Sequence, residues 1–176
     1  ESVANDTVEQ HVYLVSTEEK YTLLYNLIQQ EHAESMIVFA NRRDECRDLQ
    51  EKLLRHGVNA GLLSGEVNQG KRVSTLDAFK NGETKVLVAT DVAGRGIHIN
   101  DISHVVNFTL PEEPEDYVHR IGRTGRAFKT GVAISFMDAS EKYHVKKIEQ
   151  LIRQFIDRKP LPENVGEFET PKPEFQ

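Results

Sequence analysis

Met36-Ile37-Val38-Phe39-Ala40-Asn41 and Val86-Leu87-Val88-Ala89-Thr90-Asp91 each join an uninterrupted apolar run to a polar turn. Such a run, ended by polar residues, is typical of a strand that is buried on both faces. Short apolar runs recur along the chain with longer helical patterns between them, an alternation that is typical of β-α-β units. These stretches therefore predict an α/β fold, with a doubly wound, mostly parallel sheet and helices on both of its faces.

The same patterns predict six strands, at residues 8–15, 35–40, 60–63, 85–89, 104–108 and 131–137. Helical patterns fall between them, at about 17–31, 42–56, 68–80, 114–121 and 139–156. The first helix has Thr17 as a candidate N-cap, but Lys20 stands where a complete capping box would have Glu. We expect a single domain at residues 1–158, which is a piece of a longer protein because the chain does not begin with Met.

The end of the chain has a different composition. From Lys159 onward, four of the six prolines fall among glutamates with few aliphatic residues. This composition predicts an extended or disordered tail at 159–176, which would serve as a linker or a partner-binding strap.

Composition limits the possible functions. The 176 residues carry a net charge of −6 and a single cysteine, Cys46. The acidic balance argues against a general polyanion-binding surface, although local basic clusters can still bind phosphate. Cys46 has no Cys or His neighbour at the spacing of a metal site, so we expect no metal centre. A lone cysteine, without a signal sequence or an apolar membrane-length run, fits the reducing cytoplasm.

One motif is misleading. Gly65-Glu66-Val67-Asn68-Gln69-Gly70-Lys71 follows a strand and has the spacing of a phosphate-binding loop. Such a loop needs Ser or Thr next to ligate Mg²⁺, whereas here the residue is Arg72, and Glu66 would set a carboxylate against the phosphates. The chain alone therefore has no credible loop for gripping the β- and γ-phosphates of a nucleotide.

Three other loops carry polar residues directly after buried strands, at the sheet edge where doubly wound folds bind their ligands. They are Asn41-Arg42-Arg43, Ser64-Gly65 leading to Gln69 and Arg72, and Thr90-Asp91-Val92-Ala93-Gly94-Arg95-Gly96. The alternative for the first residues of each loop is simple helix capping. In the third loop, the glycines on both sides of Arg95 would allow a ligand to approach the backbone closely. The alternative there is a turn with an exposed arginine.

The most specific pattern is His119-Arg120-Ile121-Gly122-Arg123-Thr124-Gly125-Arg126. If this segment is helical, His119, Arg123 and Arg126 point to one side, and the two glycines keep that side uncrowded. Guanidinium groups on one stripe suit a phosphate group. A solvated basic face is the alternative, but glycines would weaken such a helix. The pattern therefore favours a binding role.

These motifs resemble the second of the two RecA-like domains of DEAD-box RNA helicases, over residues 8–156. Met36 to Asn41 resembles motif IV, Gln69 with Arg72 resembles the Gln-x-x-Arg element, Ala89 to Gly96 resembles motif V, and His119 to Arg126 resembles motif VI. The resemblance implies a RecA-like fold and an ATP-dependent RNA helicase in the complete protein. The phosphate-binding loop and the Asp-Glu-Ala-Asp motif would lie in a first RecA-like domain, so this chain would be inactive as an ATPase alone.

The resemblance also implies roles for individual residues. Arg123 and Arg126 would contact the γ-phosphate of ATP, with Arg126 as the arginine finger, and His119 would link to the ATPase motif of the first domain. The remaining ATP-binding residues would be Asp91, Gly96 and His98, while Mg²⁺ would be held mainly by the first domain. The RNA-binding residues would be Asn41, Arg42, Arg43, Gly65, Gln69, Arg72, Thr90 and Arg95.

One residue departs from the family pattern. His98 stands where the family usually has an Asp that contacts the ATP ribose, and a neutral imidazole can also hydrogen-bond a hydroxyl. Arg-Gly-x-His resembles the bacterial subgroup that works with the RNA degradosome. The expected partners are therefore RNA, the first RecA-like domain and a ribonuclease of RNA degradation.

Two other functions stay open at this stage. A DNA translocase would use the same two-domain engine, and DNA rather than RNA would then stimulate ATP turnover. A non-catalytic scaffold would bind a protein through its surface or its proline-rich tail, although the motif VI arginines are intact. Most aromatic residues occupy core-like positions, such as Phe39, Phe79, Phe108 and Phe136, so we expect little readout of bases.

Overall fold

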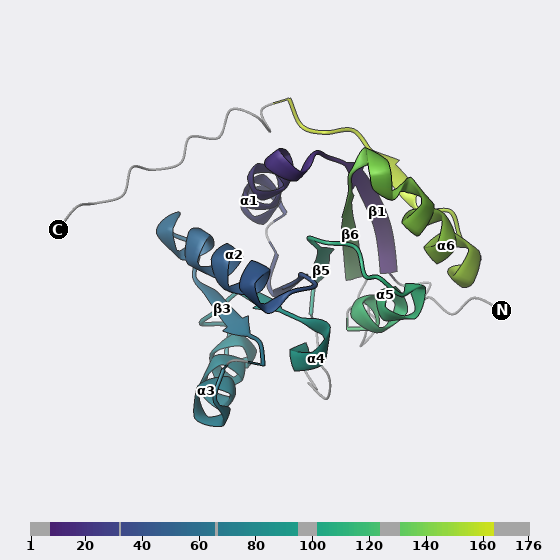
Figure 1. Ribbon diagram of the computed structural model, residues 1–176. Coiled ribbons are helices and arrows are strands. Elements are labelled where there is room, and N and C mark those ends of the chain that lie inside the picture. Colours follow the sequence, from purple (N-terminus) through teal and green to yellow (C-terminus); the bar gives the residue numbers. More distant parts are fainter. Residues whose placement is uncertain (1–7, 32, 66, 95–101, 124–130, 164–176) are drawn as a thin grey trace.

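The chain folds around one seven-stranded sheet in which every pair of neighbouring strands is parallel, with the order β3-β4-β2-β5-β6-β1-β7 (Figure 1). The structure is a computed structural model that describes residues 8–31, 33–65, 67–94, 102–123 and 131–163. The strands are β1 (Val8–Leu14), β2 (Met36–Phe39), β3 (Ala60–Leu63), β4 (Val86–Ala89), β5 (His104–Asn107), β6 (Gly131–Met137) and β7 (Asp157–Lys159).

Helices connect these strands and cover both faces of the sheet. They are α1 (Lys20–Gln30), α2 (Arg43–Arg55), α3 (Gln69–Lys80), α4 (Asp91–Gly94), α5 (Pro114–Ile121) and α6 (Lys142–Ile152). Two 3₁₀ turns, Thr17–Glu19 and Ala139–Glu141, precede α1 and α6. In the described residues, no helix has the length and apolar character needed to cross a membrane. The predicted doubly wound α/β fold is confirmed.

The alternation of side-chain direction along β2 explains why helices pack on both faces of the sheet. Met36 and Val38 point to the face that is covered by α1 and α2, whereas Ile37 and Phe39 point to the opposite face with α3. Both faces are apolar because successive side chains of a strand alternate between them. A third cluster packs α5 and α6 against β1 and β6. The uninterrupted apolar runs are therefore central strands, as predicted.

The start of the first helix differs from the prediction. Thr17 is not an N-cap: Ser16 is the N-cap of a 3₁₀ turn, Thr17–Glu19, and α1 begins after it at Lys20. The Ser16 hydroxyl donates a hydrogen bond of 2.8 Å to Glu19 Oε1, and the Ser16 backbone N–H donates one of 3.3 Å to the same oxygen. The bond from the N-cap backbone N–H to the Glu at N3, which is one half of a capping box, is thus present one residue before the predicted position.

The predicted helix over 139–156 is also wrong at its end. α6 stops at Ile152, because Arg153 adopts a left-handed backbone with φ of 57°. The chain then forms β7, which no prediction contained and which pairs with β1. Lys159 belongs to β7, and Leu161 packs against the core cluster of α1 and α2. Residues 164–176 lie outside the described part, so the proline-rich tail stays a prediction.

Candidate functional site

The carboxyl ends of β3, β4, β2 and β5 lie side by side and are tied together by hydrogen bonds between their loops. The backbone N–H of Ala40 donates to the Ala89 carbonyl at 3.2 Å, and that of Thr90 to the Leu63 carbonyl at 3.3 Å. The Asn41 N–H donates to Thr109 Oγ1 at 2.8 Å. The three predicted polar loops therefore meet at one edge of the sheet, together with the loop after β5.

Arg120 on α5 is at the centre of this edge. Tyr117, Arg120 and Ile121 form the buried face of the helix, and the Arg120 side chain is only 1% exposed. Its Nε and Nη2 donate to the two carboxylate oxygens of Asp91, each at 2.7 Å. This two-pronged geometry is the strong form of an Arg–carboxylate pair.

The remaining Arg120 donors join two further loops. Nη1 donates to Asn107 Oδ1 at 3.0 Å and to the Thr109 carbonyl at 2.9 Å, and Nη2 also donates to Asn41 Oδ1 at 2.8 Å. All five N–H groups of the guanidinium are thereby satisfied. A buried guanidinium whose donors are all hydrogen-bonded costs much less free energy than a buried charge that has lost its water and has no partner.

Asn41 acts as a link between loops and not as a helix cap. Its Nδ2 donates to the Leu110 carbonyl at 2.8 Å while its Oδ1 accepts from Arg120. The N-cap of α2 is Arg42 instead. The capping alternative is therefore wrong for Asn41, and the side chain predicted to contact RNA is engaged with the protein at both of its polar atoms.

The capping alternative does hold for Thr90. Its buried hydroxyl accepts from the Ala93 N–H at 3.3 Å and so begins the short helix α4. Arg72 reaches from α3 to donate from Nη1 to the Ala93 carbonyl at 2.8 Å. A Cβ on Gly94 would lie 3.2 Å from Phe39, so this loop packs tightly against β2. Arg72 therefore supports the loop from within the protein.

The loops after β2 and β3 also meet. A Cβ on Gly65 would lie 3.7 Å from Arg43 Cδ, so the Arg43 side chain extends over this glycine. Arg42 is 70% exposed at its side chain and pairs with Asp44 at 3.2 Å. Gln69 is the exposed first residue of α3, whose N-cap Asn68 accepts from the Lys71 N–H at 2.8 Å. Arg43 and Gly65 thus lie together, while Arg42 and Gln69 are exposed at the starts of α2 and α3.

The predicted helical stripe of His119, Arg123 and Arg126 is wrong in its described part. α5 ends at Ile121 with Gly122 as its C-cap, so Arg123 follows the helix and is not on its face. His119 is 74% exposed, with Nδ1 3.7 Å from Asp116 Oδ1. Four predicted site residues lie outside the described residues: Arg95, Gly96, His98 and Arg126.

Arg120 is the structural residue that the sequence prediction missed. It was treated as one member of a basic run, yet it falls between Tyr117 and Ile121 at the spacing of a buried helical face. A charged residue on an apolar stripe needs a buried partner of opposite charge, and Asp91 in a neighbouring loop was available. That pattern is the signal that could have revealed it.

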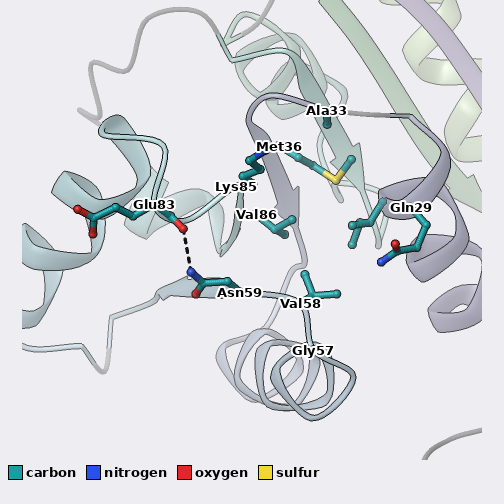
Figure 2. A pocket seen from close by; sticks show the side chains of 10 residues that line it. Gln29, Ala33, Met36, Gly57, Val58, Asn59, Glu83, Lys85 and Val86 are labelled. Carbon is teal, nitrogen blue, oxygen red and sulfur yellow. Dashed lines mark hydrogen bonds between the residues drawn. The ribbon is translucent and has the colours of Figure 1, made fainter.

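A separate pocket lies at the opposite edge of the sheet. It has a volume of about 380 Å³ and is lined by the ends of α1 and α2 and the starts of β2 and β4, including Met36, Val58 and Val86. Figure 2 shows Asn59 donating a hydrogen bond of 2.8 Å to the Glu83 carbonyl beside it. The length of the strands separates this pocket from Arg120, so we assign it no part in the candidate site. Among the described residues, no cluster of His, Cys, Asp or Glu could hold a metal ion.

Comparison with known proteins identifies the family of the chain. Residues 19–128 match the family model described as the helicase conserved C-terminal domain. The ATP-dependent RNA helicase RhlB of Pseudomonas putida is 58% identical over 89% of this chain. The match covers 39% of that protein, so the chain spans about two fifths of the length of this relative.

Solved structures give the same relationship. Escherichia coli SrmB, a DEAD-box protein bound to regulator of ribonuclease activity A, has a TM-score of 0.85 and 37% identity, with 97% of this chain and 98% of that chain covered. A DEAD-box protein from Methanococcus jannaschii has a TM-score of 0.82 and 35% identity, covering 88% of this chain and 42% of that one. The chain therefore belongs to the helicase conserved C-terminal domain family, as a second RecA-like domain of the DEAD-box type.

Proposed function

We propose that this chain is the C-terminal half of an ATP-dependent RNA helicase, in which it supplies arginines to ATP and backbone contacts to RNA. The observation that carries the proposal is the Arg120 network. One guanidinium holds Asn41, predicted for RNA, and Asp91, predicted for ATP, at the same edge of the sheet. The predicted RNA contact and the predicted ATP contact are therefore connected by hydrogen bonds to a single buried side chain.

On the ATP side, we assign to His119 and Arg123 the contact with the first domain and its nucleotide. His119 is exposed and able to reach a partner, and Arg123 follows directly on the end of α5. Arg126, in the same motif, would act as the arginine finger that stabilises charge developing on the transferred phosphoryl group. Gly96 and His98 complete the proposed nucleotide contacts.

On the RNA side, Arg42, Arg43, Gly65 and Gln69 would form the contact surface, with Arg95 from the neighbouring loop. Guanidinium groups bind phosphate oxygens without regard to base identity, so sequence-independent binding is expected. Closure of two RecA-like domains around ATP would clamp the strand and bend it, and hydrolysis would release it. Asn41, Arg72 and Thr90 would act mainly by holding these loops in place, as their hydrogen bonds within the protein indicate.

Mg²⁺ is proposed to be held by the first domain. The Asp91 carboxylate at this edge already accepts two hydrogen bonds from Arg120, which supports that assignment. The likeness to RhlB and the Arg-Gly-x-His pattern support a ribonuclease of RNA degradation as a protein partner and a cytoplasmic location.

The test is ATP turnover by the full-length protein with RNA, with DNA and with neither. Arg123→Ala and Arg126→Ala should each abolish RNA-stimulated turnover, since an arginine finger contributes on the order of 10³–10⁵ in rate. Arg55→Ala, an exposed arginine at the end of α2, is the matched control and should leave turnover unchanged. Stimulation by DNA as strong as that by RNA would favour the DNA translocase instead, and no stimulation by either would contradict both.

A further inference from the structure

The surface of α6 and β7 carries a concentration of positive charge that the candidate site does not use. Within residues 142–160 there are six basic and only two acidic side chains, although the whole chain has a net charge of −6. The six are all exposed: Lys142, Lys146, Lys147, Arg153, Arg158 and Lys159. We call these six residues, with the exposed rings of Tyr143 and Phe155, the α6 basic surface.

The helical period explains how α6 presents this surface. Val145, Ile148 and Ile152 point into the core, so Tyr143, Lys146 and Lys147 lie on the outward side of the helix. The helix covers the β1 and β7 side of the sheet, whereas α3 and the loops that it supports lie at the β3 side (Figure 1). The α6 basic surface is therefore separate from the proposed RNA contacts at Arg42, Arg43, Gly65 and Gln69.

Two aromatic rings are exposed within this surface, unlike the core-like positions of most aromatics in the chain. Tyr143 is 56% exposed and Phe155 is 78% exposed. Lys147 Nζ lies 5.7 Å from the Tyr143 ring centroid, and the Arg158 guanidinium carbon lies 4.4 Å from the Phe155 ring centroid. Each ring therefore has a cation beside it, which fixes its position at a favourable cation–π distance.

The charges on this surface are mostly uncompensated. Arg158 pairs with Glu149 at 2.6 Å, so its main effect is to orient Phe155. Within the described part of the chain, no ion pair is formed by Lys142, Lys146, Lys147, Arg153 or Lys159. Free cations alternating with exposed rings match the two needs of a single nucleic acid strand, namely phosphate neutralisation and base stacking.

We propose that the α6 basic surface is a second binding site for single-stranded RNA, which holds the strand without ATP. Lys146 and Lys147 bind phosphates, and Tyr143 and Phe155 stack bases at opposite ends of a helix about 16 Å long. RNA as the ligand rests on the proposed helicase function. The site itself does not depend on domain closure, because all of its residues lie on α6, on β7 or on the short segment between them.

The test measures binding of a fluorescein-labelled oligouridylate to the 176-residue chain by fluorescence anisotropy, without nucleotide and over a range of salt. Lys146→Glu with Lys147→Glu should weaken binding by more than about tenfold and make the salt slope shallower by roughly 1.4, since each phosphate contact contributes about 0.7. The matched control is Arg55→Glu with Lys80→Glu, an equal change of charge at exposed positions on α2 and α3.

The rings are tested separately from the charges. Tyr143→Ala and Phe155→Ala should each weaken binding by roughly five- to a hundredfold, because stacking is lost, whereas Tyr143→Phe should keep the affinity. If the control pair weakens binding as much as the α6 pair does, the binding is a general effect of charge and the proposed site is wrong. The site is also wrong if removal of either ring leaves the affinity unchanged. Unchanged circular dichroism and melting temperature establish that each variant is folded.

Failure of this inference is distinguishable from failure of the proposed function. In the full-length protein, the α6 variants should raise the RNA concentration needed for half-maximal ATPase stimulation and leave the maximal rate unchanged. Wild-type RNA affinity in the α6 variants, with turnover still lost in Arg123→Ala, overturns the second site alone. Absence of RNA-stimulated turnover in the wild-type protein overturns the helicase function, while anisotropy still reports on the α6 basic surface.

Discussion

A buried guanidinium is stable only where every one of its N–H groups finds an acceptor, and Arg120 meets that condition through four residues at the ends of three strands. Its partners Asn41, Asp91, Asn107 and Thr109 all lie at the carboxyl ends of β2, β4 and β5. Arg120 therefore fixes the relative position of loops that are far apart in the sequence. The Phe39 ring, 5.2 Å from the guanidinium carbon, supports it from the β2 side.

Replacement of Arg120 is expected to destabilise the whole domain. Arg120→Ala should lower the free energy of unfolding by about 3–5 kcal/mol, because it leaves buried acceptors and the Asp91 carboxylate without their partner. Urea denaturation of the chain measures this change. Arg120→Lys should recover only part of it, since an ammonium cannot reproduce the planar fork.

The control for Arg120 is another arginine with an ion pair. Arg42 pairs with Asp44 but is 70% exposed at its side chain, so Arg42→Ala should change stability by less than about 1 kcal/mol. Similar losses in the two variants would show that Arg120 is not a special structural centre.

Cys46 should be chemically inert in the folded chain. Burial raises the pKa of its thiol from 9.0 to about 12, so the thiolate forms in the unfolded chain well before it forms in the native one. The stability linked to this group is complete below pH 9 and falls as the pH rises from about 9 toward 12. At pH 9, an aromatic disulfide reagent should react with the native thiol more than about a hundredfold slower than in denaturing urea. Comparable rates would mean that Cys46 is accessible in the fold.

At the scale of single elements, the sequence was informative wherever burial left an unambiguous pattern. The predicted bounds of β3, β6 and α5 agree with the structure, and those of β2 and β4 differ by one or two residues. β7 was missed because Asp157-Arg158-Lys159 is wholly charged and exposed, as suits an edge strand that must not pair with other molecules. The α6 helix was predicted too long because Phe155 and Ile156 continue its apolar period.

The site was predicted in part, for a physical reason. Polar residues after parallel strands were expected to meet at one edge, and Asn41, Arg43, Gly65, Thr90 and Asp91 do so. The sequence could not show which of them bind one another, because the Arg120 network joins residues up to 79 positions apart. The roles of Arg95, His98 and Arg126 stay predictions.

The close packing of β3 against α3 leads to a further prediction about stability. A Cβ on Gly61 would lie 2.9 Å from Thr75 Cγ2, too close unless the Thr75 side chain or α3 moves. Gly61→Val should therefore lower the free energy of unfolding by about 1–3 kcal/mol despite the higher strand propensity of valine.

Gly70, in the first turn of α3, is the contrasting position. A Cβ there would lie 3.6 Å from Asn68 Oδ1, an ordinary contact. Gly70→Ala should raise stability by about 0.4–1 kcal/mol in the same denaturation assay, because the unfolded chain loses freedom. Destabilisation by Gly70→Ala, or none by Gly61→Val, would contradict the packing described for α3.

At the scale of the whole molecule, the isolated chain should have no ATPase activity. The loop Gly65 to Lys71 lacks the Ser or Thr that would ligate Mg²⁺, and the charge of Asp91 is already paired. Phosphate release by the purified 176-residue chain should match that of a heat-inactivated sample, with or without RNA. Any turnover that grows with RNA concentration would contradict the proposal that ATP is held mainly by a first RecA-like domain.

The order of the strands in the sheet also constrains how the chain can fold while it is being synthesised. β1 is synthesised before the other strands of this sheet, yet its partners are β6 and β7, and Val8 pairs with Gly131. A nascent chain that has reached β4 can pair β2, β3 and β4 with one another, but β1 must wait until β6, at residues 131–137, has also been made. Such distant pairing is slow to form and leaves β1 unpaired in the meantime, with its core residues Val8 and Val12 exposed. We therefore expect the nascent chain to need a chaperone until β6 has left the exit tunnel.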